Sequence, residues 1–361
     1  MSHLSIAQCA GQVIVAGFGA LGPSPDLCGL ARAGQLAGFV LFRRNLRSLA
    51  EVAEQNALLR SLAPDEPPLW IAVDQEGGRV ARLGAPLVQL PPARVLGSLD
   101  DLELTRDAAH ALGESLSLLG FNLDFAPVLD VDTNPDNPVI GDRSFSNDPA
   151  QVIRHAGAFA TGLARAEVAG CGKHFPGHGD TQLDSHFALP VLPHARERLD
   201  RVELAPFAAL SGSLPSIMTA HVVFQSIDAT RPGTLSRDVI ELLRQQLGFN
   251  GLVFSDDLEM KAVSDSFGVA EAACLAIEAG CDQVLICEHE EHTLHAHAAL
   301  VERAEREPAF ARRLTEAAER GRRMRMRFWP RPVVHLNEAE LTRRLLEIAA
   351  PIEHRIEAAL T

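Results

Sequence analysis

The sequence predicts an α/β protein built as a single (β/α)8 barrel of the TIM type with a C-terminal helical extension. Short apolar runs alternate with longer helical patterns along the 361 residues, and 47% of the residues are hydrophobic, which suffices for a large core. Ionisable side chains also gather where the runs end, as they do on the active face of such barrels. Eight runs are expected to form the barrel strands: 13–18, 38–42, 69–73, 122–126, 171–175, 216–221, 252–255 and 283–287.

The segments themselves carry the signals of strands and helices. Each apolar run is nearly continuous and contains β-branched or aromatic residues, as parallel strands that are buried on both faces require. Between the runs, Ser48 with Glu51 forms the pattern of a capping box, and Asp148-Pro149 is a typical helix start. Gly120 lies where a helix should end. Strand and helix signals therefore alternate as βα units.

The last part of the chain is expected to be helical. Residues 1–330 are predicted to form the catalytic barrel, and residues 331–361 a helical appendage. The arginine-rich segment 312–331 is interleaved with acidic and apolar residues, which is typical of a helix that packs on a barrel. Pro351 is expected to break the final helix.

Composition argues against several classes of partner. Lys and Arg number 33 against 47 Asp and Glu, and the net charge of −14 repels phosphate backbones and anionic membranes. No apolar run reaches the roughly 18–20 residues of a spanning helix. The six cysteines lie in apolar stretches without a C-x-x-C pair, as reduced thiols do, and the N-terminus lacks the basic start of a signal peptide. A cytoplasmic protein with no nucleic-acid or membrane partner is expected, and its oligomeric state stays open.

The segment 173–186 holds the most concentrated chemistry in the chain. It reads K-H-F-P-G-H-G-D-T-Q-L-D-S-H, so many ionisable side chains follow the fifth predicted strand directly. Its proline and glycines exclude a helix, and a mobile loop over the barrel mouth is expected. Further polar residues mark the ends of other strands: Asp74 after the third, Asp124 in the fourth, His221 in the sixth and Asp256 in the seventh.

At these residues the sequence resembles the glycoside hydrolase family 3 β-N-acetylglucosaminidases of the NagZ type. Segment 173–186 is close to that family's signature, and the resemblance spans roughly residues 10–330 in the family's order. The other matching motifs are V-D-Q-E-G-G-R-V at 73–80, G-D-R-S-F at 141–145, M-T-A-H at 218–221 and F-S-D-D-L at 254–258. The resemblance implies a retaining exo-β-N-acetylglucosaminidase that releases terminal N-acetylglucosamine, from muropeptides in peptidoglycan recycling or from chitooligosaccharides.

The resemblance also implies roles for individual residues. Asp256 corresponds to the nucleophile, and His186, paired with Asp184, to the general acid/base. The substrate-binding residues implied are Asp74, Arg82, Arg143, Lys173 and His174. No cofactor and no metal are implied.

Independent chemistry agrees with two of these assignments. Retaining enzymes normally place two carboxyl groups about 5–5.5 Å apart, and here a histidine would replace one of them. An imidazole with an unperturbed pKa of about 6.5 can both donate and accept a proton near neutrality. Lys173 and Lys261 are the only lysines in a chain that otherwise uses arginine, so a lysine at a strand end suggests a site that needs a compact ammonium group.

Other interpretations remain open at this level. Asp257 is the rival to Asp256, although adjacent strand residues should point to opposite sides, so Asp257 is taken as a structural neighbour. The same scaffold could serve a phosphorylase, an enzyme in which the substrate's acetamido group is the nucleophile, or a sugar-binding protein without turnover. A metal-dependent barrel hydrolase would use His174, His178, Asp180, Asp184 and His186 as ligands, whereas His289, His292, His295 and His297 are taken as a solvated helix face.

Overall fold

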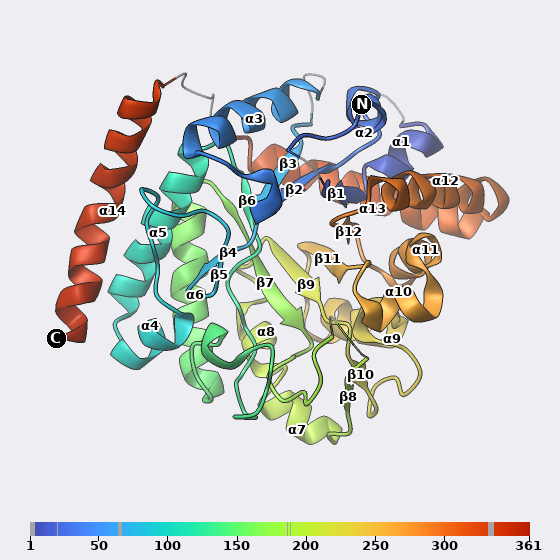
Figure 1. Cartoon of the computed structure of the whole chain (residues 1–361). Coiled ribbons are helices and arrows are strands. Elements are labelled where there is room, and N and C mark those ends of the chain that lie inside the picture. The colour runs from blue at the N-terminus through green and yellow to red at the C-terminus, as the bar shows by residue number, and fades with distance from the viewer. Residues whose placement is uncertain (1–3, 20, 64–66, 186, 188, 331–335) are drawn as a thin grey trace.

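The chain folds into a closed barrel of parallel strands surrounded by helices (Figure 1). The computed structural model describes residues 4–19, 21–63, 67–185, 187, 189–330 and 336–361. Within these ranges eight strands close in the order β1-β12-β11-β9-β7-β6-β3-β2, which confirms the predicted barrel. The strands are β1 (Ile14–Ala16), β2 (Gly38–Leu41), β3 (Trp70–Val73), β6 (Leu123–Asp124), β7 (Ala169–Phe175), β9 (Ser216–Thr219), β11 (Leu252–Asp257) and β12 (Gln283–Ile286).

The strands are buried on both faces. Side chains such as Val15, Val40, Phe125 and Phe254 pack together inside the barrel, and the rings of Phe125 and Phe254 meet edge to face at 5.6 Å. The alternate residues, including Ile14, face outward and pack against the helices. Two-sided burial explains why these segments read as continuous apolar runs in the sequence.

Helices follow the strands and cover the outside of the barrel. The capping box of Ser48 and Glu51 starts α3, and Asp148 caps α6, as the sequence predicts. The helices are α1 (Ile6–Gly11), α2 (Pro25–Arg32), α3 (Leu49–Ser61), α4 (Ala93–Leu99), α5 (Leu102–Leu118), α6 (Pro149–Arg165), α7 (Arg196–Arg201), α8 (Ala205–Leu210), α9 (Arg237–Glu241), α10 (Lys261–Phe267), α11 (Val269–Ala279), α12 (Glu290–Arg306), α13 (Pro308–Arg327) and α14 (Glu338–Leu360).

Short elements shape the loops beyond the strand ends. β4 (Gln75–Gly77) and β5 (Val80–Ala81) form an antiparallel hairpin after β3, and β8 (Val191–Leu192) pairs with β10 (Val223–Phe224) in parallel. The short helical turns are η1 (Arg43–Asn45), η2 (Gly141–Arg143), η3 (Gly233–Leu235) and the π-helical η4 (Leu242–Gln246).

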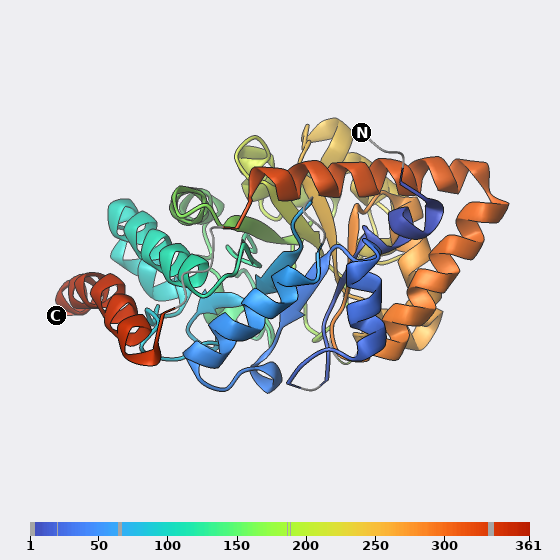
Figure 2. The same ribbon diagram turned by 90° about the horizontal axis from the view of Figure 1, so that it is seen from above.

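The N-terminal end of the barrel is closed by side chains and by α13. Trp70 Nε1 donates to Gln283 Oε1 at 2.9 Å in the barrel interior, and Phe328, just after α13, belongs to the same buried cluster. Arg325 of α13 is fully buried and donates to Gln12. Figure 2 shows α13 as the long orange-red helix along the upper edge of the view, beside α1. A ligand can therefore reach the barrel from the other end, where the strands terminate.

The final helix departs from the sequence prediction, because Pro351 lies inside α14 and does not break it. A proline within a helix costs about 3 kcal/mol through its missing N–H and its ring. The apolar face of α14 offsets this cost, since Leu341, Leu345, Ile352 and Ile356 are buried. Figure 1 shows α14 at the edge of the molecule beside α5. The predicted division between residues 330 and 331 lies at the edge of segment 331–335, which is outside the described residues, so it stays a prediction.

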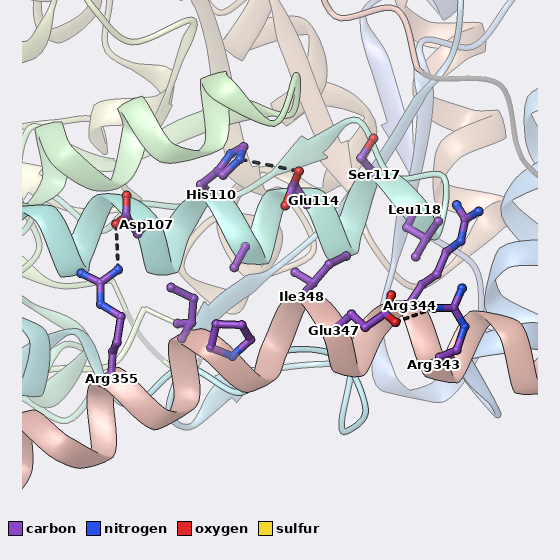
Figure 3. Close-up of a pocket in the computed structure, with 13 residues that line it drawn as sticks. Asp107, His110, Glu114, Ser117, Leu118, Arg343, Arg344, Glu347, Ile348 and Arg355 are labelled. Atoms are coloured by element: carbon purple, nitrogen blue, oxygen red, sulfur yellow. Dashed lines mark hydrogen bonds and ion pairs between the residues drawn. The ribbon is translucent and has the colours of Figure 1, made fainter.

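A groove of about 1050 Å³ lies between α5 and α14 (Figure 3). Its charged side chains pair with one another: Arg355 Nη1 lies 2.8 Å from Asp107 Oδ2, and His110 Nε2 lies 3.6 Å from Glu114 Oε1. The groove lies outside the barrel, away from the strand ends. Its size therefore reflects how a long helix packs on its neighbour, and the chemistry lies elsewhere.

Candidate active site

A cavity of about 170 Å³ opens at the C-terminal ends of the barrel strands. Most of the site residues predicted from the sequence contribute to its wall. Asp74 follows β3 directly, Lys173 and His174 lie near the end of β7, and Asp256 is the last but one residue of β11. The lining residues are Val40, Phe42, Asp74, Glu76, Val80, Arg82, Phe125, Val139, Arg143, Lys173, His174, His178, Ser185, Met218, Asp256, Asp257, Met260, Leu285 and Cys287.

One wall of the cavity is a network of buried charges centred on Lys173. Its ammonium Nζ lies 2.8 Å from Asp74 Oδ1 and 2.7 Å from Glu76 Oε1, and its side chain is only 3% exposed. Arg82 reaches the other oxygen of Asp74 at 3.3 Å. Arg143 binds Glu76 with two hydrogen bonds of 2.9 and 2.7 Å. Three cations thus meet two carboxylates at one wall.

Glu76, a member of this network, was not predicted from the sequence. Glu76 follows Asp74 by two residues and lies in β4, the first strand of the hairpin after β3. Because the alternation of a strand places residues i and i+2 on the same side, that spacing was the signal that could have found it. Glu76 ties Arg143, which comes from the distant turn η2, to Lys173.

Charge pairing overcomes burial in this network. Burial opposes ionisation of Asp74, but the charges of Lys173 and Arg82 outweigh it and lower the pKa of this carboxyl. Burial likewise opposes ionisation of Glu76, but the charges of Arg143 and Lys173 outweigh it and lower its pKa. Burial also opposes the charge of Lys173, yet Asp74 and Glu76 raise the pKa of its ammonium group. All of these groups are therefore charged near neutral pH and offer fixed donors and acceptors to a polar ligand.

His174 is held in one orientation by a fully buried carboxylate. Its Nδ1 lies 2.7 Å from Asp130 Oδ2, and the other oxygen of Asp130 accepts the backbone N–H of His178 at 2.6 Å. A carboxylate on Nδ1 fixes the tautomer of the ring and leaves Nε2 as the nitrogen available to a ligand in the cavity. Asp130, which the sequence analysis did not single out, is thus a positioning residue.

Asp256 and Asp257 both contribute to the lining of the cavity. The pairing of β11 with β12 shifts register between Phe254 and Asp257, and this irregularity interrupts the alternation of the strand. Oδ1 of Asp257 accepts the backbone N–H groups of Glu259 at 3.1 Å and Cys287 at 3.3 Å. These bonds support the interpretation of Asp257 as a structural neighbour of Asp256.

Asp257 is expected to make the stability of the protein depend on pH. Burial raises its pKa from 3.8 to about 7, with the charges of Glu259 and Asp256 adding to the effect. A raised carboxyl pKa means that the folded state loses stability as pH rises from the unfolded value of 3.8 through about 7. D257N keeps the accepting oxygen but cannot ionise. We expect its stability relative to the parent to be higher at pH 8 than at pH 4 by a few kcal/mol. Urea unfolding at both pH values measures this difference, and an equal difference at both would contradict the shift.

The loop after β7 brings some of its predicted residues to the cavity. Ser185 lines the cavity, while Asp184 is half-buried beside it, outside the lining. His178 is buried and hydrogen-bonded by its two ring nitrogens, with Nε2 2.9 Å from Ser185 Oγ and Nδ1 2.8 Å from Thr181 Oγ1. His186, the predicted acid/base, lies outside the described residues, so its assignment stays a prediction.

Three described members of the alternative metal-binding set, His174, His178 and Asp180, have separate partners. His174 binds Asp130, His178 binds Ser185 and Thr181, and Asp180 pairs with His194. Burial and the neighbouring His174 lower the pKa of His178 to about 4, which keeps this ring neutral. These three side chains therefore do not converge on a common point as metal ligands do.

Asp124 lies beneath the charged network and is fully buried. One of its oxygens accepts the backbone N–H of Gln75 at 2.9 Å, and the other has no hydrogen-bond partner among the described residues. Burial raises its pKa well above the usual value. Burial thus disfavours the charged form of Asp124, which supports the turn after β3 and is not among the residues that line the cavity.

The sequence of this chain is similar to those of known glycoside hydrolases. Residues 25–320 match the model described as the glycosyl hydrolase family 3 N terminal domain. The β-hexosaminidase of Alkalilimnicola ehrlichii is 42% identical over 265 residues, which cover 71% of this chain and 75% of that protein. The β-hexosaminidase of Pseudomonas aeruginosa is 39% identical over 259 residues, covering 72% of this chain and 77% of its own length.

A solved structure shares the whole architecture. The glycoside hydrolase family 3 β-N-acetylglucosaminidase from Paenibacillus sp. str. FPU-7 superposes with a TM-score of 0.90 at 40% identity, covering 98% of this chain and 69% of that one. None of the described helices combines the length and the apolar character needed to cross a lipid bilayer.

Proposed function

Because the chain belongs to glycosyl hydrolase family 3, we propose that it is a retaining exo-β-N-acetylglucosaminidase that works through a covalent glycosyl-Asp256 intermediate. The observation that carries the proposal is the position of Asp256 at the end of β11, in one small cavity with the buried Lys173 network. A carboxylate next to fixed donors and acceptors suits nucleophilic attack on a bound sugar.

The proposed reaction has two steps. In the first, an oxygen of Asp256 attacks the anomeric carbon while the bond to the glycosidic oxygen breaks and His186 protonates that oxygen. In the second, His186 removes a proton from water, the water oxygen attacks the anomeric carbon, and the bond to Asp256 breaks. Two inversions give net retention. Asp184 would orient the ring of His186.

The charged wall is proposed to bind the sugar hydroxyls. In this wall the carboxylates accept hydrogen bonds from the sugar, whereas the lysine and the two arginines donate them. With Asp256 included, the three positive side chains face three carboxylates, so the charges of the wall balance. Such a balanced set suits a neutral, hydroxyl-rich ligand. A cavity of about 170 Å³ holds one sugar ring rather than a longer oligosaccharide, which supports release of a terminal residue.

We further propose that the natural substrates are N-acetylglucosaminyl muropeptides, handled in the cytoplasm during peptidoglycan recycling. All six cysteines are unpaired thiols, which agrees with a reducing compartment. The relatives named β-hexosaminidase support the amino sugar at the non-reducing end.

A comparison of two chromogenic substrates tests the activity. We expect an aryl β-N-acetylglucosaminide to be hydrolysed much faster than the matching β-glucoside, with the same rate in the presence and absence of phosphate. Formation of sugar 1-phosphate, with a rate that rises with phosphate, would identify a phosphorylase instead. Saturable binding of N-acetylglucosamine without release of the aryl group would identify a sugar-binding protein.

Leaving-group dependence tests the role of His186. We expect H186A to lose about 10²–10⁴-fold activity on a substrate with a poor leaving group, because general acid catalysis contributes that much, and far less on an activated aryl glycoside. D184A should be milder, since removing the orienting group leaves the imidazole in place. Equal losses by H186A on both substrates, or a greater loss by D184A, would contradict the assignment.

A further inference from the structure

Three possible metal ligands meet at the rim of the barrel mouth, outside the cavity that holds Asp256. Glu259 lies just after β11, His289 is the N-cap residue of α12, and His292 lies in its first turn. Oε1 of Glu259 is 2.9 Å from Nδ1 of His289 and 2.6 Å from Nδ1 of His292. One ligand atom from each residue lies within 4.8 Å of the other two. The sequence analysis had assigned both histidines to a solvated helix face.

The carboxylate of Glu259 is fixed in place by the backbone. Its side chain is 9% exposed, and it accepts the N–H groups of Glu288 and His289 at the start of α12, the latter at 3.1 Å. Outer hydrogen bonds of this kind hold metal-binding carboxylates in position. Glu259 is therefore a preorganised ligand.

The two imidazoles crowd one oxygen of this carboxylate. Oε1 of Glu259 faces both Nδ1 atoms and also the backbone N–H of His289. A carboxylate oxygen has about two lone-pair sites, so three nitrogen atoms within 3.1 Å crowd it. Tetrahedral ligands at about 2.0–2.2 Å from zinc lie roughly 3.3–3.5 Å apart, so shifts of under about 1 Å would place a cation among these three atoms.

We propose that Glu259, His289 and His292 bind a divalent transition-metal ion, for which Zn²⁺ is the representative. Two imidazole nitrogens and one carboxylate oxygen form a ligand set that suits Zn²⁺, Co²⁺ or Ni²⁺, whereas Mg²⁺ and Ca²⁺ prefer oxygen ligands alone. His289 is 54% exposed and His292 36% exposed, so the ion can enter from solvent and keep a water as its fourth ligand.

The ion would clamp the loop after β11 to the start of α12. The backbone N–H of Glu259 donates to Asp257 Oδ1 at 3.1 Å, and the N–H of Asp257 donates to Asp256 Oδ1 at 2.8 Å. Through these bonds the site supports the segment that carries Asp256. It supplies no group to the sugar, so the ion stabilises the rim and takes no part in bond cleavage.

Titration of the metal-free full-length protein tests the site directly. Co²⁺ is followed by its visible absorption and Zn²⁺ by calorimetry, at pH 8, because protons compete with the metal for imidazole nitrogens at lower pH. We expect one saturable site whose Kd rises at least about tenfold in H292A and in E259Q. Saturating Zn²⁺ should raise the Tm of the parent by about 2–5 °C and leave the Tm of H292A unchanged.

Two controls separate this site from others. H295A removes an exposed imidazole from the same helix and should bind Zn²⁺ like the parent. The double variant D184A/H186A removes ligands that the catalytic loop itself could offer, and it too should keep the site. Near-equal Kd values for the parent and a folded H289A/H292A double variant, or loss of binding only in D184A/H186A, would overturn the proposal.

Discussion

Replacing Asp256 by alanine is expected to lower kcat/KM for an aryl β-N-acetylglucosaminide by at least about 10⁴-fold, because it removes the atom that forms the covalent bond. The side chain lies at the end of β11 in the cavity, and a shortened residue leaves the cavity wall otherwise intact. D265A, which removes an exposed carboxylate from α10, is the matched control and should keep the activity of the parent.

Chemical rescue distinguishes loss of a nucleophile from loss of structure. Azide added to D256A should restore turnover and give the α-glycosyl azide, since the small anion attacks once from the face that Asp256 occupied. In the parent, a 5-fluoro N-acetylglucosaminyl fluoride should label Asp256, as located by peptide mass. A label on Asp257 would make that residue the nucleophile. Rapid turnover of the parent with no label and with an oxazoline product would instead identify the acetamido group of the substrate as the nucleophile.

Much of the barrel could be predicted because each strand is buried on both sides. Two-sided burial demands an almost purely apolar segment, and all eight such segments became strands of the closed barrel. The starts of these helices could be predicted equally well, because Ser48 and Asp148 accept backbone N–H groups only two or three residues away. Features that depend on local sequence were therefore predicted correctly.

Features that depend on contacts between distant parts of the chain could not be predicted from the sequence. Pro351 is tolerated because an apolar face of α14 packs on α5, and the position of α5 cannot be read near residue 351. The partners Glu76 and Asp130 come to Lys173 and His174 only when the barrel closes. Asp257 contributes to the cavity lining next to a register shift between β11 and β12, which the motif F-S-D-D-L does not encode in its own spacing.

The meeting of Glu259 with His289 and His292 has the same origin. The first residue follows the seventh barrel strand, whereas the two histidines begin the helix after the eighth. Only neighbouring strand ends bring them within hydrogen-bonding distance. Along the sequence the histidines share an acidic helix with His295 and His297, and nothing in that helix separates the two that face Glu259 from the two that do not.

Replacing Lys173 by methionine is expected to lower kcat/KM by at least about 100-fold and to destabilise the fold by about 3 kcal/mol. Loss of one partner of a buried ion pair costs about 3–5 kcal/mol, because the remaining charge is left unsolvated. Here Arg82 and Arg143 still compensate Asp74 and Glu76, which places the effect at the lower end. Activity falls because a charged hydrogen-bond donor to the sugar is lost as well. K173R should not restore either property, since a planar guanidinium does not fit a site closed around a compact ammonium group.

The pH dependence of the destabilisation identifies its cause. The pKa values of Asp74 and Glu76 are lowered from 3.8 and 4.5, so their contribution is present above those values and is lost as pH falls below them. The pKa of Lys173 is raised from 10.5, so its contribution is complete below that value and is lost only as pH rises further. The difference between the parent and K173M should therefore be largest between about pH 5 and pH 10 and shrink below pH 4, as urea unfolding would measure. K261M, at the chain's only other lysine, exposed at the start of α10, should match the parent throughout. A destabilisation of K173M that is constant from pH 3 to pH 8 would mean that lost packing, rather than the buried carboxylates, is responsible.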